Sequence, residues 1–470
     1  MSDTQQNITV KINSLLSEVN RIAKNNVIFS NSDDLKNFEE SLQQKVLELA
    51  DNITASKLQQ SIGPEKLKSE SGQIVSDCPS KMKNMGKRKV HIRFSGGTSI
   101  EIESVYYCRK GRQYKVKKKG FYPSFLLLGV YEQCTLSFIS KIGLLATSCC
   151  SFEESKKLSS LLLGYDIEVK KIYSISKNLS KRCEFARDNE LFEFKEPSSN
   201  LIVTVSVDGG RIRIRKNKKG KKTAKKRSRY HTNWKEPKLM TLYTVDDTGK
   251  KDNTFNPIID GSISGPDTVF ALLISYLRKL GVNNIKKLLF VSDGAKWIWN
   301  RVSIIIEKLG LSPEKFYTLL DYYHMAEHLN TITKLLKLQK KDADKWVRKV
   351  KKQFLEGKID KGIKLIKETT ARTRNKELKR ERNYFLYHYK NGNLDYLKIK
   401  NENLPIGSGA IESAVRRVIN QRLKGCGIFW KLENANAMIM LRSFYKAERW
   451  DMLMDMGVKG EIAIVKSYPQ

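Results

Sequence analysis

Two segments far apart in the chain have the same form: a run of β-branched and apolar residues that ends in an aspartate followed by glycine. They are LIVTVSVDGG, residues 201–210, and LLFVSDG, residues 288–294. Asp-Gly often marks only the turn at which a strand ends. Open α/β sheets, however, bind ligands beyond the carboxyl ends of their strands. The sequence therefore predicts that Asp208 and Asp293 meet at one edge of a sheet.

Strands alternate with helices around these two segments. Strand patterns cover 201–208, 238–246, 254–260, 287–292 and 316–322, and helical patterns cover 266–280 and about 296–309. Residues 324–390 read as almost wholly helical, and one more helix follows at about 408–423. This order predicts a mixed α/β core that an all-α block interrupts before its last helix.

The patterns divide the chain into seven parts. We expect a helical N-terminal segment (1–77), a small β-region (78–122), a helical region (123–195), the first part of the α/β core (201–323), an α-helical insertion (324–400), the last core helix (401–450) and a tail (451–470). Within 123–195, two short helices around Gly164 fit either a helix-turn-helix DNA reader or an ordinary helical hairpin.

The formal net charge of +37 is unevenly distributed. Residues 1–70 carry 8 Lys/Arg against 10 Asp/Glu, whereas 211–229 carry 12 basic residues in 19 and no acid. Codon bias scatters lysines but does not cluster them, so the pattern predicts a nucleic-acid partner. The candidate DNA contacts are Arg211, Arg213, Arg215, Lys218, Lys219, Lys221, Lys222, Lys225, Lys226, Arg227 and Arg416.

Other classes of protein are disfavoured. The longest apolar runs, FLLLGV and LIVTVSV, are far shorter than the roughly 18–20 residues that span a bilayer. The start MSDTQQNITV does not have the form of a secretory signal. Seven cysteines form no regular framework, which is typical of a reducing compartment. We therefore expect a cytoplasmic protein with no membrane partner.

Two carboxylates that converge on one point repel each other unless a cation neutralises them. Hard oxygen ligands suit Mg²⁺ or Mn²⁺, and two such ions could support phosphodiester cleavage. A third acid is expected from the helix in LPIGSGAIESAVRRVINQRLKGCGIFW, where Glu412 lies beside an apolar face. An exposed ion pair with Arg416 is the plainer explanation of Glu412. The two strand-end aspartates upstream favour the metal-ligand interpretation.

Six stretches carry a family resemblance: VSVDGGRIRIR, WKEPKLMTLY, DGSISGPDTVFALLISYLRKLG, VSDGAKWIW, DYYHMAEHL and the Glu412 helix. Together they resemble bacterial insertion-sequence transposases of the Asp-Asp-Glu (DDE) class, in particular the Kra-type family related to Mutator-like transposases. The resemblance covers roughly Val90 to Trp450. It implies a ribonuclease-H-like core with an all-α insertion, and Asp208, Asp293 and Glu412 as the triad that binds Mg²⁺ or Mn²⁺.

The same resemblance implies cutting and joining of DNA at the terminal inverted repeats of a mobile element, with target DNA as a second substrate. It also implies at least a homodimer and a bacterial, nucleoid-associated location. The alternative is a catalytically inactive or domesticated DNA-binding relative. Relatives tend to carry paired cysteines before the β-segment, but here Cys78 and Cys108 lack neighbours, so we expect no zinc.

Three further features remain open on the sequence alone. HMAEH, residues 324–328, fits the H-x-x-E-H pattern of zinc peptidases, but such a short pattern arises easily by chance. Asp321 and His324 either line the expected site or cap a helix. Trp297 either stacks on a base near the cut or packs in the core, and Trp234 is expected to be structural.

Overall fold

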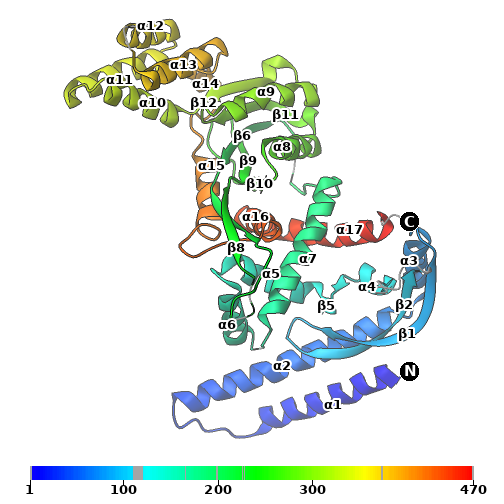
Figure 1. Cartoon of the computed structure of the whole chain (residues 1–470). Helices are drawn as coiled ribbons and strands as arrows, with labels where there is room; N and C mark the ends of the chain where they lie inside the picture. Colours follow the sequence, from blue (N-terminus) through cyan, green and yellow to red (C-terminus); the bar gives the residue numbers. More distant parts are fainter. Residues whose placement is uncertain are drawn as a thin grey trace. The chain divides into compact units, whose positions relative to one another are not determined.

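The structure is a computed structural model that describes residues 3–109, 120–164, 166–196, 199–224, 226, 228–371 and 374–467. The chain divides into two compact units, Met1–Phe192 with Asp451–Gln470, and Glu193–Trp450 (Figure 1). The secondary structure is mixed α/β, as the sequence predicts. Among the helices of the described residues, none has the length and apolar character needed to cross a membrane.

The first unit combines helices with a small sheet of order β3-β2-β1-β5-β4. Its elements are α1 (Asp3–Lys24), α2 (Ser32–Ser61), α3 (Glu65–Ser76), β1 (Met82–Arg93), β2 (Ser99–Arg109), β3 (Gly120–Phe121), α4 (Pro123–Leu127), β4 (Val130–Tyr131), β5 (Cys134–Thr135), α5 (Leu136–Ser148), α6 (Phe152–Leu163), α7 (Val169–Asp188) and α17 (Trp450–Ser467). One core joins α1 and α2 to the sheet, with Ile8, Ala55, Ile92 and Ile102 buried together. The N-terminal helices and the β-region therefore share a hydrophobic core.

The helices α6 and α7 lie on either side of Gly164, at the positions that the sequence indicates. Ser151 caps α6 by accepting a hydrogen bond from the Glu154 backbone N–H at 3.0 Å, and Glu154 accepts one from the Cys150 N–H at 2.6 Å. These two hydrogen bonds satisfy backbone N–H groups at the start of α6. Gly164 ends α6 in the left-handed conformation, with φ of 68°.

We expected residues 451–470 to be a tail, but residues 451–467 form most of the helix α17, which belongs to the first unit. The helix packs closely on α7, since a Cβ atom added at Gly460 would lie 2.0 Å from the Arg182 carbonyl oxygen. The Cys183 thiol also donates to the Leu453 carbonyl oxygen at 3.2 Å. A short-range pattern cannot show this packing, because α7 and α17 are far apart in sequence.

The second unit is built on a five-stranded sheet of order β10-β9-β6-β11-β12. Its strands are β6 (Leu201–Gly209), β7 (Ile212–Asn217), β8 (Tyr230–Lys235), β9 (Lys238–Val245), β10 (Ile258–Ser262), β11 (Ile285–Ser292) and β12 (Phe316–Leu320). The strands β6, β9 and β10 pair antiparallel, whereas β11 pairs parallel with β6 and β12 pairs parallel with β11. The strands β7 and β8 form a separate two-stranded ribbon.

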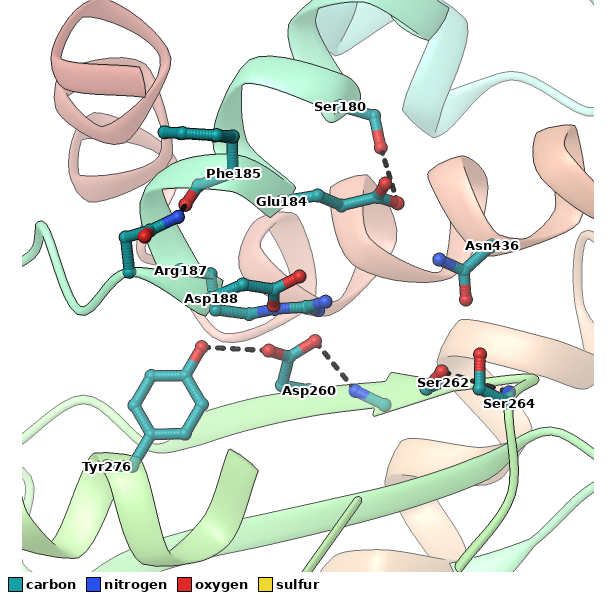
Figure 2. Close-up of polar contacts among 12 residues, drawn as sticks. Ser180, Glu184, Phe185, Arg187, Asp188, Asp260, Ser262, Ser264, Tyr276 and Asn436 are labelled. Carbon is teal, nitrogen blue, oxygen red and sulfur yellow. Dashed lines mark hydrogen bonds and ion pairs between the residues drawn. The ribbon is translucent and has the colours of Figure 1, made fainter. Parts of the chain in front are cut away.

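The second unit also contains helices that pack on this sheet or lie beside it. They are α8 (Pro266–Leu280), α9 (Lys296–Leu309), α10 (Tyr322–Leu335), α11 (Lys340–Leu355), α12 (Ile359–Thr370), α13 (Lys376–Lys390), α14 (Tyr396–Asn401), α15 (Gly409–Ala414), the π-helix η4 (Val415–Asn420) and α16 (Leu432–Lys446), with short 3₁₀ turns at Val282–Asn284 and Pro313–Lys315. Helix α8 packs on β9 and β10, and a fully buried Asp260 of β10 accepts from the Tyr276 hydroxyl of α8 at 2.8 Å (Figure 2). That hydrogen bond holds α8 on the sheet.

Helices α10 to α14 form the insertion that the sequence predicts, beside the β12 edge of the sheet (Figure 1). Its core is continuous with that of the sheet, because Leu289, Leu319, Leu329, Phe354 and Phe385 belong to one buried cluster. The insertion is therefore fixed to the β11 and β12 side of the sheet by apolar packing.

The packing of Phe385 gives a test of this shared core. Phe385→Ala removes a fully buried ring and leaves a cavity, which should lower the free energy of unfolding by about 3–5 kcal/mol. Leu397→Ala, at a side chain that is 38% exposed, is the control and should change it by less than about 0.5 kcal/mol. Urea denaturation followed by tryptophan fluorescence measures both, and equal effects would contradict a shared core.

Candidate active site

Asp208 and Asp293 lie at the same edge of the sheet. In the parallel pairing of β6 with β11, Val205 is the partner of Phe290, and each aspartate follows its residue of this pair by three positions. The two acids are therefore level with each other on neighbouring strands. The edge at which they lie is the carboxyl end of both strands, as the sequence predicts.

Ser292 fixes the two strands at this edge. Its side chain is fully buried between β6 and β11. The Val207 backbone N–H donates to the Ser292 hydroxyl oxygen at 2.9 Å, and that hydroxyl donates to the Val207 carbonyl oxygen at 3.1 Å. Because Val207 and Ser292 immediately precede the aspartates, this reciprocal bond sets the positions from which both carboxylates leave the sheet.

The environment of Asp208 disfavours its charged form. Burial raises the pKa of Asp208 to about 6, and the negative charge of Asp293 contributes in the same direction. The Gly209 backbone N–H, which donates to the carboxylate at 2.5 Å, opposes the shift, as do the charges of His324 and Lys238. A carboxylate pair of this kind is the arrangement that a bound cation stabilises.

Asp293 is held at the entrance of α9. Its carboxylate accepts from the Ala295 N–H at 3.1 Å, and its carbonyl oxygen accepts from the Trp299 indole N–H at 2.6 Å. Trp299 is buried and packs edge-on against Phe290 and His388. Trp299 is therefore a core residue.

The glycines that follow the aspartates allow close packing. A Cβ atom at Gly294 would lie 2.0 Å from the Tyr384 ring, and one at Gly210 would lie 2.7 Å from the Ile419 side chain. Tyr384 belongs to the insertion and Ile419 to the π-helix, so both glycines allow another element to approach the edge that carries the acids. The glycines therefore do more than allow the chain to turn at the end of each strand.

Glu412 lies on α15, which packs against β6 and β9. Its side chain is 53% exposed, and its Oε1 atom lies 3.6 Å from Nε2 of His324. The other imidazole nitrogen of His324, Nδ1, lies 3.3 Å from the Glu327 carboxylate. His324 thus stands between the Glu412 helix and α10, and its charge also acts on Asp208.

Asp321 has a structural role. Its side chain is fully buried, and one carboxylate oxygen caps α10 by accepting from the His324 backbone N–H at 2.7 Å. The other oxygen accepts from the Ser408 N–H, at the start of α15. Of the two interpretations of Asp321, helix capping is the one that the structure shows, because both carboxylate oxygens accept hydrogen bonds from backbone N–H groups at helix starts.

Lys238 is a residue of this edge that the sequence analysis missed. It begins β9 as the register partner of Gly209, and its charge lowers the pKa of Asp208. Its ammonium group lies 4.2 Å from the centroid of the Trp297 ring and 3.1 Å from the Glu236 carboxylate. The only sequence signal was a lysine within the strand pattern KLMTLYTV, and its significance depends on the pairing of β6 with β9. Trp297 is half-buried beneath this lysine.

A metal ion fits the chemistry of the paired aspartates, although the structure does not present a complete ligand set. Within the described residues, no group of three or more His, Cys, Asp or Glu side chains is arranged to hold a metal ion. Asp208 and Asp293 offer hard oxygen atoms and mutual repulsion, which suit Mg²⁺ or Mn²⁺. The exposed Glu412 side chain lies against His324.

The HMAEH histidines bind different partners. Nδ1 of His328 lies 2.5 Å from the buried Glu381 carboxylate, and its ring stacks on Tyr384 at 3.8 Å between centroids. His324 instead faces Glu327 and Glu412. This division gives no support to a zinc-peptidase site, in which both histidines would converge on one ion.

The basic segment at 211–229 contains β7 and precedes β8, and these two strands pair to form the ribbon. The side chains of Arg211, Arg215, Lys218, Lys219, Lys221, Lys222, Lys226 and Arg416 are exposed, and Arg213 is half-buried. The candidate contacts Lys225 and Arg227 lie outside the described residues. The ribbon offers a strongly basic surface that begins two residues beyond Gly209.

Comparison with known proteins adds no assignment, since no protein-family model and no curated protein matches this chain.

The raised pKa of Asp208 predicts a pH-dependent stability. The folded protein holds the Asp208 proton more tightly than the unfolded chain, whose ordinary value is 3.8. The resulting stabilisation is complete below about pH 4 and is lost as pH rises through the folded-state pKa of about 6. Its size should be about 2–3 kcal/mol.

Asp208→Asn should remove this loss, so its free energy of unfolding should exceed that of the wild type increasingly between about pH 4 and pH 7, reaching a difference of about 2–3 kcal/mol. Chemical denaturation in EDTA at several pH values measures the difference. Asp247→Asn, at a side chain that is 81% exposed, is the control and should follow the wild type. A constant difference between Asp208→Asn and the wild type would mean that Asp208 is ionised throughout.

Proposed function

We propose that this protein is a DDE-type transposase, which cuts and joins DNA with the help of divalent metal ions. The observation that carries the proposal is the placement of Asp208 and Asp293 at the carboxyl ends of two adjacent parallel strands. A ribbon with a dense cluster of basic residues leaves the sheet at that same edge. A site that cleaves phosphodiester bonds needs acidic side chains that bind metal ions and, next to them, basic side chains that bind phosphates.

The topology of the second unit supports a ribonuclease-H-like core. Three antiparallel strands, β6, β9 and β10, are followed by β11 and β12, which pair parallel on the other side of β6. The insertion α10–α14 lies between β12 and the helix that carries Glu412. This is the chain order that the resemblance to insertion-sequence transposases implies.

The roles of the residues follow from their positions. Asp208 and Asp293 would hold Mg²⁺ or Mn²⁺, and Glu412 would complete the ligand set. The bound metal ions would supply the positive charge that favours the attacking hydroxide and stabilises the leaving oxygen. Lys238 and His324, whose charges already act on Asp208, would bind the scissile phosphate beside it. The ribbon would hold the DNA backbone through contacts that are independent of sequence.

The substrates in this proposal are the terminal inverted repeats of a mobile element and its target DNA, in the bacterial cytoplasm. Joining two ends calls for at least a homodimer. The alternative is a DNA-binding relative without catalytic activity, and cleavage assays separate the two. Either protein would use the ribbon to bind DNA.

The first test removes the charges of the three acids. Asp208→Asn, Asp293→Asn and Glu412→Gln keep the size of each side chain, so binding to DNA ends should persist. Cleavage with Mg²⁺ should fall by roughly 10³-fold or more in each, and the double variants should be no worse than the single ones. Asp267→Asn, at an exposed carboxyl on α8, should cleave normally.

The outcomes distinguish the assignments. Normal cleavage by Glu412→Gln, with both aspartate variants inactive, would show that the third ligand is another residue. A wild type that binds DNA ends but never cleaves them would favour the inactive relative.

The second test concerns the ribbon. Replacing Lys218, Lys219, Lys221, Lys222, Lys226 and Arg229 with Gln should weaken binding to all DNA sequences alike. It should also flatten the dependence of log affinity on log salt, by about one unit for each phosphate that the ribbon no longer neutralises. The matched control replaces the six basic residues of segment 1–62 with Gln, namely Lys11, Arg21, Lys24, Lys36, Lys45 and Lys57. An equal change of salt slope in the two variants would show that net charge, and not the ribbon, determines binding.

A further inference from the structure

The ribbon β7–β8 continues the β6–β9 ladder past the candidate site. Asp208 pairs with Leu239 and Gly209 with Lys238, and the Gly210 N–H then donates to the Pro237 carbonyl oxygen at 2.9 Å. The pairing resumes at Ile212 with Lys235. The base of the ribbon is thus a direct extension of the strand that carries Asp208.

One side of the ribbon is anchored. Ile212 and Ile214 are buried. The edge of β7 is also paired with the chain at Trp430, since the Arg215 N–H donates to the Trp430 carbonyl oxygen at 2.8 Å and the Trp430 N–H donates to the Arg213 carbonyl oxygen at 3.0 Å. These contacts hold the ribbon base in a fixed orientation.

The other face of the ribbon carries arginines on β7 and two aromatic rings on β8. Side chains alternate along a strand, and Arg213 is the register partner of Trp234, so Arg213, Arg215, Trp234 and Tyr230 share this face. Trp234 is 52% exposed and Tyr230 is 40% exposed. Trp234 is therefore not a core residue, because its ring lies on the surface of a two-stranded ribbon.

The guanidinium groups lie over these rings. Arg211 and Arg213 are 5.1 and 5.8 Å from the centroid of Trp234, and Arg215 is 5.8 Å from that of Tyr230. Arg213 is further fixed by a hydrogen bond to the Gly425 carbonyl oxygen. The segment 211–235 contains no acid, so the exposed Arg211 and Arg215 keep their charge available for phosphates, whereas Arg213 also lies 4.6 Å from the Phe429 ring. Planar cations beside exposed rings are suited to stacking on nucleobases.

We propose that this Arg/aromatic face is a stacking platform for unpaired DNA bases next to the cut. The ligand is a single-stranded segment of DNA, whose bases stack on Trp234 and Tyr230 while the arginines bind its phosphates. Paired bases cannot offer their faces in this way, so the platform selects unpaired DNA. The inference rests on the proposed function, because it takes Asp208 to mark the position of the cut.

The position of the platform fits this role. Arg213 follows Asp208 by five positions, which corresponds to at most about 17 Å along an extended strand. A stacked DNA strand covers that length with about five nucleotides. The platform therefore holds the DNA strand a few nucleotides away from the cut.

The test measures binding without catalysis, with full-length protein in EDTA. The probes are a fully paired DNA duplex and the same duplex with a short unpaired thymine extension, and fluorescence anisotropy gives both affinities. The wild type should prefer the extended duplex. Trp234→Ala should lower affinity for the extended duplex by about 10-fold and for the paired duplex by less than about 2-fold. Trp234→Phe should restore most of the preference, because it keeps an aromatic face.

Tyr389→Ala, at an exposed tyrosine of the insertion, is the matched control and should leave both affinities unchanged. Equal weakening of both DNAs by Trp234→Ala would show that the ribbon lies in a duplex groove, and would overturn the proposal. A wild type without preference for the extended duplex would overturn it as well. The binding assay contains no metal ion and does not depend on catalysis. Absence of cleavage in a separate assay with Mg²⁺ would therefore contradict the proposed enzymatic function and not the proposed stacking platform.

Discussion

The parallel pairing of β6 with β11, fixed by Ser292, is the contact on which the candidate site depends. Two carboxylates repel each other, so their side chains cannot bring the strands together. The strands are held instead by buried apolar residues and by the reciprocal hydrogen bond between Ser292 and Val207. Backbone pairing thus places Asp208 and Asp293 side by side, and burial, together with the charge of Asp293, raises the pKa of Asp208.

A second polar contact organises the helices around this edge. The buried Asp321 accepts hydrogen bonds from the first turn of α10 and from Ser408 at the start of α15. One side chain therefore fixes both the helix that carries His324 and the helix that carries Glu412. Because α10 begins the insertion, the large helical block and the third acid are positioned from the same point at the end of β12.

Much of this arrangement was visible in the sequence, and the reasons are local. Pro266 and Gly281 bracket the α8 pattern, so its ends were predictable, and the β-branched runs before Asp208 and Asp293 identified the central strands. What the sequence did not reveal depends on contacts between distant segments. Lys238 reaches the site only through register with Gly209, and the surface position of Trp234 follows from its pairing in a ribbon with one exposed face. The role of α17 required knowledge of its packing on α7.

In the proposed enzyme, the electrostatics of this edge would couple metal binding to DNA binding. Lys238 and His324 lower the pKa of Asp208, whereas Asp293 raises it. A phosphate bound beside Lys238 and His324 would offset their charges and bring further negative charge to the two carboxylates. The carboxylates would then hold a divalent cation more tightly, and by linkage a bound cation would strengthen the hold on the phosphate by the same factor. In the proposed enzyme, the basic ribbon thus brings DNA phosphates close to the two carboxylates. The negative charge of these phosphates would make metal binding more favourable when DNA is bound.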